Sequence, residues 1–370
     1  MRITSIDLRA CAPEAGTAAG AVEESRLPGG RRPPFVVVRM ETDEGLTGTS
    51  FAFGTLDPKA AAAAMSPLRE FFLGRDPIER GRAWAEFRHF NRSWTHAPIY
   101  AYGPFDNACW DITGLAAGLP VHRLLGGVRD RVPTYVSSMF LTGGIPAYIE
   151  QALDARRRGF KAYKIHPTGD IGVDLELYAA VRDAVGGGFP LMADPVGAYT
   201  YEEALVAGRA LERLGYRWLE EPVPDDDWHS QRKLREKLDI PVIGTETTPF
   251  AHRGTSSAIA FDLVDAVRTD VSWRGGITGV MRTAALADAF GMRCELHTCV
   301  AHALDLVNLH CAAAVANCTY FELLYPLEDN DFGLKTGIRI EDGFAIPPDA
   351  PGLGIDYDWD AIDDCTVAMV

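Results

Sequence analysis

The chain has 370 residues, of which 47% are hydrophobic and 24% are charged, and its formal net charge at pH 7 is −15. This composition is typical of a globular protein with a large core, and the length favours two domains. The acidic balance and the lack of a basic stripe argue against a nucleic-acid partner. No apolar run approaches the roughly 20 residues that a membrane span needs.

The start of the chain and its cysteines indicate the compartment. Residues 1–10 are typical of a strand rather than of a signal peptide. The seven cysteines form no CxxC pair, and their number is odd. We therefore expect free thiols in a reducing, cytoplasmic environment.

Residues 1–125 predict an α+β domain. Segments rich in β-branched and apolar residues indicate strands at 4–9, 35–39 and 46–52. Helices are expected at 59–73, 77–90 and 103–117. Residues 16–34, rich in Gly, Ala, Arg and Pro, are too long for a hairpin turn and predict a loop.

From about Val132 a short apolar strand followed by a helix repeats along the chain. The expected strands are 134–139, 162–166, 190–194, 218–221, 242–245, 266–270, 293–297 and 320–322. Eight strands alternating with helices favour an α/β fold closed into a (β/α)8 barrel of the TIM type over an open doubly wound sheet, because no GxGxxG motif follows an early strand. Residues 126–333 make the predicted barrel domain. Residues 334–370 are expected to pack back on the first domain and complete it as a capping domain.

An ionisable residue ends each predicted barrel strand from the second to the eighth. These residues are Lys164 and His166, then Asp194, Glu220, Glu246, Asp270, His297 and Glu322. From His166 onward, successive positions lie 24 to 28 residues apart, about the length of one βα unit. Any one of them could be a solvated loop residue. Together they indicate a site at the C-terminal end of the barrel, where barrel enzymes place their chemistry.

Three of these residues predict a metal site. Asp194, Glu220 and Glu246 lie on three adjacent predicted strands, and carboxylates that converge without a cation raise one another's pKa. A hard divalent cation relieves this repulsion, and oxygen ligands suit Mg2+ or Mn2+ better than Zn2+. Glu221 is expected to point to the opposite side of its strand.

The remaining residues suggest acid–base chemistry. Lys164 and His166 are two apart on one strand, so both should face the barrel interior. Asp270 and His297 lie on neighbouring strands, and an Asp that binds one ring nitrogen fixes the His tautomer and makes it a better base. Each pair could instead be a structural ion pair.

Taken together, these motifs resemble the enolase superfamily, and specifically its mandelate racemase subgroup (the mandelate racemase/muconate lactonizing enzyme family). The resemblance is carried by residues 42–48 (TDEGLTG), 159–166 (GFKAYKIH), 192–194 (MAD), 218–222 (WLEEP), 244–246 (GTE), 270–279 (DVSWRGGITG), 291–297 (GMRCELH) and 320–322 (YFE). It implies a small carboxylate substrate bound to Mg2+, with His297 removing the α-proton and Asp270 orienting it. Lys164 would stabilise the enediolate. Glu322 could donate a hydrogen bond to it if protonated, and a buried position near carboxylates would raise the pKa of Glu322.

One departure from the family pattern bears on the reaction. His166 stands where the family has a second lysine, which favours one-base chemistry such as β-elimination of water from a sugar acid. A racemase, epimerase or cycloisomerase acting on a 2-hydroxy carboxylate is the alternative. A non-catalytic, metal-stabilised binding barrel is a third reading, against which the joint presence of Lys164, Asp270, His297 and the metal residues argues. The resemblance also implies a homo-oligomer.

Several further residues are candidates for substrate binding. They are Arg26, Phe51, Phe53, Ser137, Trp273 and Arg274. The loop that contains Arg26 could fold over the barrel mouth, and Phe51 and Phe53 sit where the family's second cap loop lies. Trp273 and Arg274 follow Asp270 closely, and simple packing explains these side chains equally well. Glu295, in phase with His297, is expected to face the interior, without an assigned role.

Overall fold

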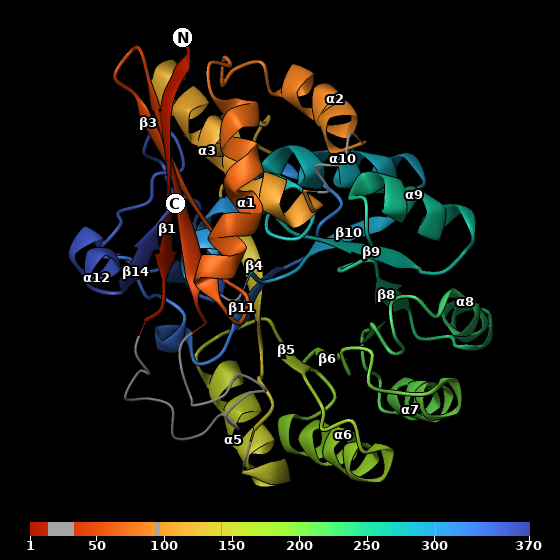
Figure 1. Ribbon diagram of the computed structural model, residues 1–370. Helices are drawn as coiled ribbons and strands as arrows, with labels where there is room; N and C mark the ends of the chain where they lie inside the picture. Colours follow the sequence, from red (N-terminus) through yellow and green to blue (C-terminus); the bar gives the residue numbers. More distant parts are fainter. Residues whose placement is uncertain (14–32, 93–96, 142, 300) are drawn as a thin grey trace.

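A four-stranded antiparallel sheet forms the centre of the cap, in the order β14-β1-β2-β3 (Figure 1). Its strands are β1 (Ile3–Cys11), β2 (Phe35–Thr42), β3 (Thr47–Phe53) and β14 (Thr366–Met369). The computed structural model describes residues 1–13, 33–92, 97–141, 143–299 and 301–370. Because β14 comes from the C-terminal tail and pairs with β1, the cap combines both ends of the chain, as the predicted fold requires.

Helices α1 (Pro58–Phe72) and α3 (Ile99–Ala117) cover the cap sheet, and α2 (Arg80–Phe90) packs on these two helices. The Asp57 side chain accepts the Lys59 N–H and caps α1, as expected for an N-cap aspartate. The sequence analysis placed the start of α2 at Pro77, which is wrong. The Asp76 carboxylate accepts the Ile78 N–H at 3.0 Å, and this Asx turn holds residues 77–79 outside the helix.

Eight parallel strands form the barrel, and the prediction of a TIM-type fold is confirmed. The strands are β4 (Val132–Ser137), β5 (Ala162–Ile165), β6 (Leu191–Ala193), β7 (Leu219–Glu220), β8 (Val242–Gly244), β9 (Ala266–Thr269), β10 (Arg293–Leu296) and β11 (Phe321–Leu324). Hydrogen-bonded ladders run from β10 back to β4 and on to β11, and β10 and β11 are in contact. A hairpin of β12 (Ile340–Glu341) and β13 (Phe344–Ala345), which the sequence analysis missed, adds to β4.

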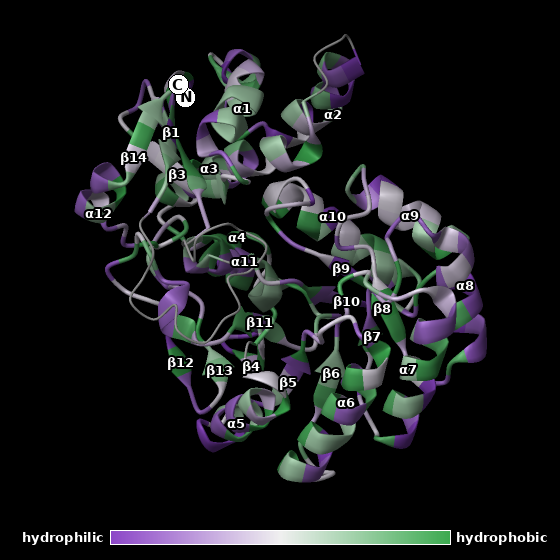
Figure 2. Ribbon diagram, turned by 60° about the horizontal axis from the view of Figure 1, so that its bottom comes forward, coloured by the Kyte–Doolittle hydropathy of each residue, from purple (hydrophilic) through white to green (hydrophobic). Residues whose placement is uncertain are grey.

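Helices surround the barrel strands (Figures 1 and 2). They are α4 (Val121–Leu124), α5 (Gly144–Arg157), α6 (Ile171–Val185), α7 (Tyr201–Arg213), α8 (Trp228–Lys237), α9 (His252–Ala260), α10 (Gly276–Ala289) and α11 (His302–Ala314), with α12 (Trp359–Asp364) in the tail. Across the described ranges, every helix is too short or too polar to cross a lipid bilayer. All seven cysteines are free thiols.

Helix α3 of the cap holds the first turn of barrel helix α10. The Asp106 carboxylate accepts the Thr278 N–H at 2.8 Å and its hydroxyl at 2.7 Å, and the Asn107 side-chain oxygen accepts the Ile277 N–H at 3.0 Å. The two helices meet so closely that a Cβ on Gly276, whose φ is +75°, would lie 2.7 Å from the Gly103 carbonyl oxygen. Side chains of one unit therefore cap a helix of the other.

Replacing Asp106 with alanine should destabilise the protein by about 1–2 kcal/mol, because two N-terminal donors of α10 lose their acceptor. Urea unfolding measures this cost, and hydrogen exchange should rise in both α10 and α3. Asp170→Ala is the matched control, since Asp170 caps α6 within its own unit and should loosen α6 alone. Unchanged exchange in α3 after Asp106→Ala would contradict the docking role.

Candidate active site

The candidate site is the upper of two layers of side chains inside the barrel. The lower layer is apolar and consists of Tyr135, Ala162, Met192, Trp218, Ile243, Ala266 and Tyr320. Side chains two apart on a strand share a face. The residues two positions further along these strands, toward their C-terminal ends, therefore form a second layer inside the barrel. That layer is Ser137, Lys164, Asp194, Glu220, Thr245, Arg268 and Glu322. It is polar, buried and almost fully charged.

Lys164 is the centre of this polar layer. Its Nζ lies 2.8 Å from Asp194 Oδ2, 2.7 Å from Glu220 Oε1 and 2.8 Å from Glu322 Oε1. Burial alone would lower the pKa of Lys164, but the three carboxylates raise it well above its ordinary value. The structure thus brings three predicted strand-end carboxylates around one ammonium group.

Arg268 is the second cation of the layer, and the sequence analysis missed it. Its Nε lies 2.9 Å from Glu220 Oε1, and Nη2 contacts Glu322 Oε2. The Arg268 backbone N–H donates to the Thr245 hydroxyl oxygen at 3.2 Å, and the same hydroxyl donates to the Arg268 carbonyl oxygen at 2.9 Å. The signal that could have revealed it is its position, two residues before Asp270 on the same strand.

The surroundings of Glu322 favour the ionised carboxylate, so the prediction of a raised pKa is wrong. Burial would raise its pKa, but Lys164 and Arg268 lower it well below its ordinary value. The carboxylate also accepts the Ser137 hydroxyl at 2.6 Å and the Thr298 N–H at 3.1 Å. Ser137 is fully buried, and its contact with the site runs through Glu322.

His297 and Asp270 form the predicted pair. His297 Nδ1 lies 3.3 Å from Asp270 Oδ2, and its Nε2 lies 3.2 Å from Glu246 Oε1. Asp270 is itself fixed by the N–H groups of Ser272 and Trp273, at 2.6 and 2.7 Å. Burial lowers the pKa of His297, but Glu246 and Asp270 together raise it to about 9.

This raised pKa predicts a pH-dependent stability in chelator-treated protein. The folded-state pKa of about 9 exceeds the ordinary value of 6.5, so protonated His297 stabilises the fold fully below pH 6.5. That stabilisation is lost as the pH rises through 9, by up to about 3 kcal/mol. Urea unfolding at about pH 6 and pH 9.5 measures the loss. His297→Asn should flatten this part of the profile, and an equal slope in that variant would assign it to another group.

The three predicted metal ligands follow consecutive strands but do not converge on one point. Asp194 is held by Lys164 and by His166, whose Nε2 lies 3.2 Å from Asp194 Oδ2. Glu220 faces Lys164 and Arg268 and accepts the Trp218 indole N–H at 2.9 Å, while Glu246 faces His297. In the parts of the chain that the structure describes, no three His, Cys, Asp or Glu side chains already form a metal shell.

The chemistry of these donors nevertheless fits a hard divalent cation. All of them are carboxylates, the ligands that Mg2+ and Mn2+ prefer. Burial and then the Asp194 charge raise the pKa of Glu246, and burial together with Glu246 raises the pKa of Glu221 to about 8. Glu221 points away from Lys164, and its Oε1 accepts the Glu246 N–H at 2.9 Å. The crowding of negative charge is what a cation would relieve.

His166 is fixed by its neighbours at the barrel mouth. Its backbone N–H donates to the Ser138 hydroxyl at 2.9 Å, and Nδ1 contacts the Ser138 carbonyl oxygen. A carbonyl at Nδ1 requires the proton on that nitrogen, so Nε2, beside Asp194, is the atom available for proton exchange.

The substrate-binding candidates fall into different environments. Phe53 stacks on Trp273 with ring centroids 4.7 Å apart, and this contact joins the cap to the loop after β9. Phe51 instead packs in the core between Phe35 and Tyr357. Arg274 is buried and donates to the Ala251 carbonyl oxygen and the Thr255 hydroxyl, both at 2.6 Å.

Arg274 thus packs under the loop before α9. Phe53 and Trp273 are the two candidates placed at the cap–barrel junction. Arg26 lies outside the described residues. Glu295 also has a role away from the site. Its carboxylate accepts the N–H groups of Thr319 and Tyr320 and pairs with Arg293. It therefore holds the turn before β11.

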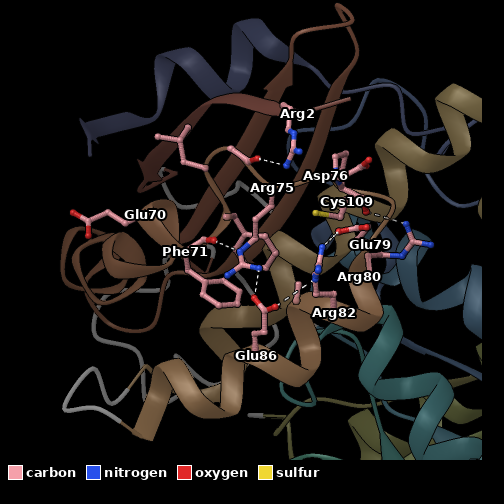
Figure 3. A pocket seen from close by; sticks show the side chains of 15 residues that line it. Arg2, Glu70, Phe71, Arg75, Asp76, Glu79, Arg80, Arg82, Glu86 and Cys109 are labelled. Carbon is pink, nitrogen blue, oxygen red and sulfur yellow. Dashed lines mark hydrogen bonds and ion pairs between the residues drawn. The ribbon is translucent and has the colours of Figure 1, made fainter.

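A separate cavity of about 400 Å3 lies in the cap, between the end of α1 and the start of α2 (Figure 3). Its charged side chains are largely paired with one another. Arg75 lies 2.6 Å from Glu86, and Arg82 lies 2.8 Å from Glu79. None of the candidate site residues lines this cavity, so we place the chemistry at the barrel mouth.

The fold and the site define a capped (β/α)8-barrel enzyme. Residues 147–361 match the enolase C-terminal domain-like family, and residues 28–126 match the mandelate racemase/muconate lactonizing enzyme N-terminal domain. The chain therefore belongs to the enolase superfamily, in the mandelate racemase subgroup, and the predicted family is confirmed.

Individual relatives are dehydratases and cycloisomerases of sugar acids. The chain is 34% identical over 336 residues to an arabinonate dehydratase of Saccharolobus solfataricus, covering 86% of this chain and 87% of that protein. It is 29% identical over 350 residues to a D-galactarolactone cycloisomerase of Agrobacterium fabrum, covering 90% and 91%. The crystal structure of a D-glucarate dehydratase from Agrobacterium tumefaciens, complexed with magnesium, is similar over 100% of both chains, with a TM-score of 0.87 and 32% identity.

Proposed function

We propose that this enzyme dehydrates a sugar acid: it removes the α-proton of a polyhydroxy carboxylate, eliminates the β-hydroxyl as water, and yields a 2-keto-3-deoxy acid. The observation that carries the proposal is the Asp270–His297 pair. Asp270 contacts Nδ1 of His297, and Nε2 on the other side of the ring faces Glu246, one of the proposed metal ligands. The dehydratases among the relatives support it. Mg2+ is the proposed cofactor, with Mn2+ as a substitute, and Asp194, Glu220 and Glu246 would hold it.

When bound, the cation supplies positive charge that stabilises the enediolate. The chain's own residues do the rest of the chemistry. His297 Nε2 accepts the α-proton. The Asp270 carboxylate accepts a hydrogen bond from His297 Nδ1–H and stabilises the imidazolium that forms. His297 then returns the proton to the departing β-hydroxyl, so that water leaves rather than hydroxide. The enol product takes up a proton at C3 as it becomes the ketone.

Lys164 adds fixed positive charge beneath the substrate carboxylate. Preorganised charge in a water-poor site is worth more than in solution, and removing one such group typically costs 10²–10³-fold in rate. Because Lys164 is held by three buried carboxylates, it need not reorganise as negative charge develops on the substrate.

Cycloisomerisation or epimerisation is the second candidate. The replacement of the family's second lysine by His166 leaves room for it, because this second imidazole stands beside Asp194, on a strand remote from that of His297, and could serve as a second acid–base group. The relationship to a 3,6-anhydro-alpha-L-galactonate cycloisomerase of Streptomyces coelicolor, at 30% identity over 89% of this chain, points the same way. In this reading His166 delivers a proton to the face opposite His297.

The test is a screen of sugar acids and their lactones in D2O with Mg2+ or Mn2+, followed by proton NMR and a 2-keto acid assay. A 2-keto-3-deoxy product supports the dehydratase. Deuterium at C2 without a keto product, or isomerisation of a lactone, establishes the second candidate instead. If a screen of acids of every common configuration gives neither turnover nor exchange, both proposals fail.

A further inference from the structure

We propose that Arg268 is a positioning residue of the active site: it neutralises and orients Glu220 and Glu322, so that the site accepts an anionic substrate beside one divalent cation. This inference rests on the proposed function, which it extends by one residue. Arg268 touches neither the base nor the mouth of the barrel, and it acts through the two carboxylates.

The guanidinium of Arg268 spans the barrel interior. From β9 it reaches Glu220 at the end of β7 and Glu322 on β11. Its Nη1 donates to the Leu296 carbonyl oxygen at 3.1 Å and to the Tyr135 hydroxyl at 3.4 Å. The side chain is completely buried. One planar group therefore fixes elements from four strands, and the forked shape of arginine suits two carboxylates at once.

The charges of the site balance only when Arg268 is counted. In the resting site, before His297 gives up its proton to become the base, His297 offsets the charge of Asp270. The four carboxylates of Asp194, Glu220, Glu246 and Glu322 then face two cations, Lys164 and Arg268. The remainder of two negative charges equals the charge of one divalent cation. Without Arg268 a further negative charge would remain beneath the place where the substrate carboxylate must lie.

Stability alone does not account for this arrangement. Buried ion pairs contribute little net stability, because the desolvation of both charges offsets their attraction. The apolar layer directly below, with Ala266 two residues before Arg268, shows that the same strand fills the barrel with a small side chain where no charge is needed. An arginine one layer higher, between two site carboxylates, points to a role in the chemistry.

The test compares Arg268→Gln and Arg268→Lys with the wild type. For Arg268→Gln we expect kcat to fall about 100-fold and KM to rise about tenfold. The Kd for Mg2+, measured by calorimetry without substrate, should decrease, because the site becomes more negative. Arg268→Lys keeps the positive charge but lacks the forked guanidinium that binds two carboxylates at once. Its kcat should be about tenfold higher than that of Arg268→Gln.

Arg182 offers a matched control, since it is buried and contacts no carboxylate of the site. Its guanidinium donates to the backbone carbonyl oxygens of Leu214, Gly186, Phe189 and Gly215 and lies over the Tyr216 ring. Arg182→Gln should lower the melting temperature and leave kcat, KM and the Kd for Mg2+ unchanged. Circular dichroism and the melting temperature establish that each Arg268 variant is folded before its kinetics are compared.

Two results overturn the inference. One is a folded Arg268→Gln protein with wild-type kcat and KM. The other is weaker Mg2+ binding in Arg268→Gln with no recovery in Arg268→Lys, which is the behaviour of a purely structural residue. If the wild type turns over no acid, the proposed dehydration fails by itself. The Mg2+ affinities then still decide: tighter binding in Arg268→Gln supports the charge role, and equal or weaker binding refutes it.

Discussion

Replacing His297 with asparagine should reduce turnover by about 10²–10⁴-fold, the range that a general base contributes. Asparagine can still face Asp270 through its side-chain amide, but it cannot accept the α-proton. His297 Nε2 faces Glu246 of the proposed metal site and is the proposed acceptor of the α-proton. Without it, exchange of the substrate α-proton with solvent should vanish together with product formation. Both are measured by proton NMR in D2O, on a protein whose Mg2+ binding is checked separately.

Asp270→Asn serves as a graded comparison. Asp270 touches the far nitrogen of the ring, at 3.3 Å, so its loss should misplace the imidazole and lower turnover without removing the base. Exchange should then be slowed and not abolished. Turnover of His297→Asn within tenfold of the wild type would transfer the role of base to another residue, with His166 the next to be replaced.

Lys164→Met should be the most damaging single change in the barrel. It leaves Asp194, Glu220 and Glu322 buried with Arg268 as the remaining internal cation of the described layer. Breaking a buried ion pair from one side costs about 3–5 kcal/mol, because an uncompensated charge remains. Turnover should also fall by at least about 10²-fold, since fixed positive charge at the site is lost.

Lys161→Met is the matched control for that change. Lys161 lies just before the same strand, and its Nζ sits 4.8 Å from the Phe344 ring centroid, away from the site. It should shift the urea midpoint only slightly and leave turnover intact. If Lys164→Met unfolds at the same urea concentration as Lys161→Met, the buried carboxylates do not depend on Lys164 as inferred.

The barrel was predictable because its signal is repeated and local. Each βα unit carries its own apolar strand, and the regular spacing of Asp194, Glu220, Glu246, Asp270 and His297 marks the strand ends. The contact of Lys164 with Asp194 and Glu220 follows from that register. Pairing between distant segments leaves no such local pattern, which is why the β12–β13 hairpin and the part of β14 in the cap sheet could not be located in advance.

The error at Glu322 traces to the cations around it. A raised pKa was expected because Glu322 lies buried near carboxylates, but Lys164 and the unrecognised Arg268 together lower it. Counting two residues forward from each member of the apolar layer would have placed Arg268 beside Lys164 and Glu220. Phe51 packs between Phe35 and Tyr357, and Arg274 binds Ala251 and Thr255. These are tertiary contacts, which sequence periodicity does not encode.

The position of β14 has a consequence for synthesis of the chain. Strand β1 precedes the whole barrel in the chain, yet residues 8–11 on one of its edges pair with residues 366–370, through bonds such as that from the Val370 N–H to the Leu8 carbonyl oxygen at 2.9 Å. Figure 1 shows β14 beside β1 in the cap sheet. On the ribosome, all eight barrel strands therefore emerge while β1 still presents an unpaired edge, a surface prone to pairing with other chains. The barrel can assemble first, and the cap sheet is closed last.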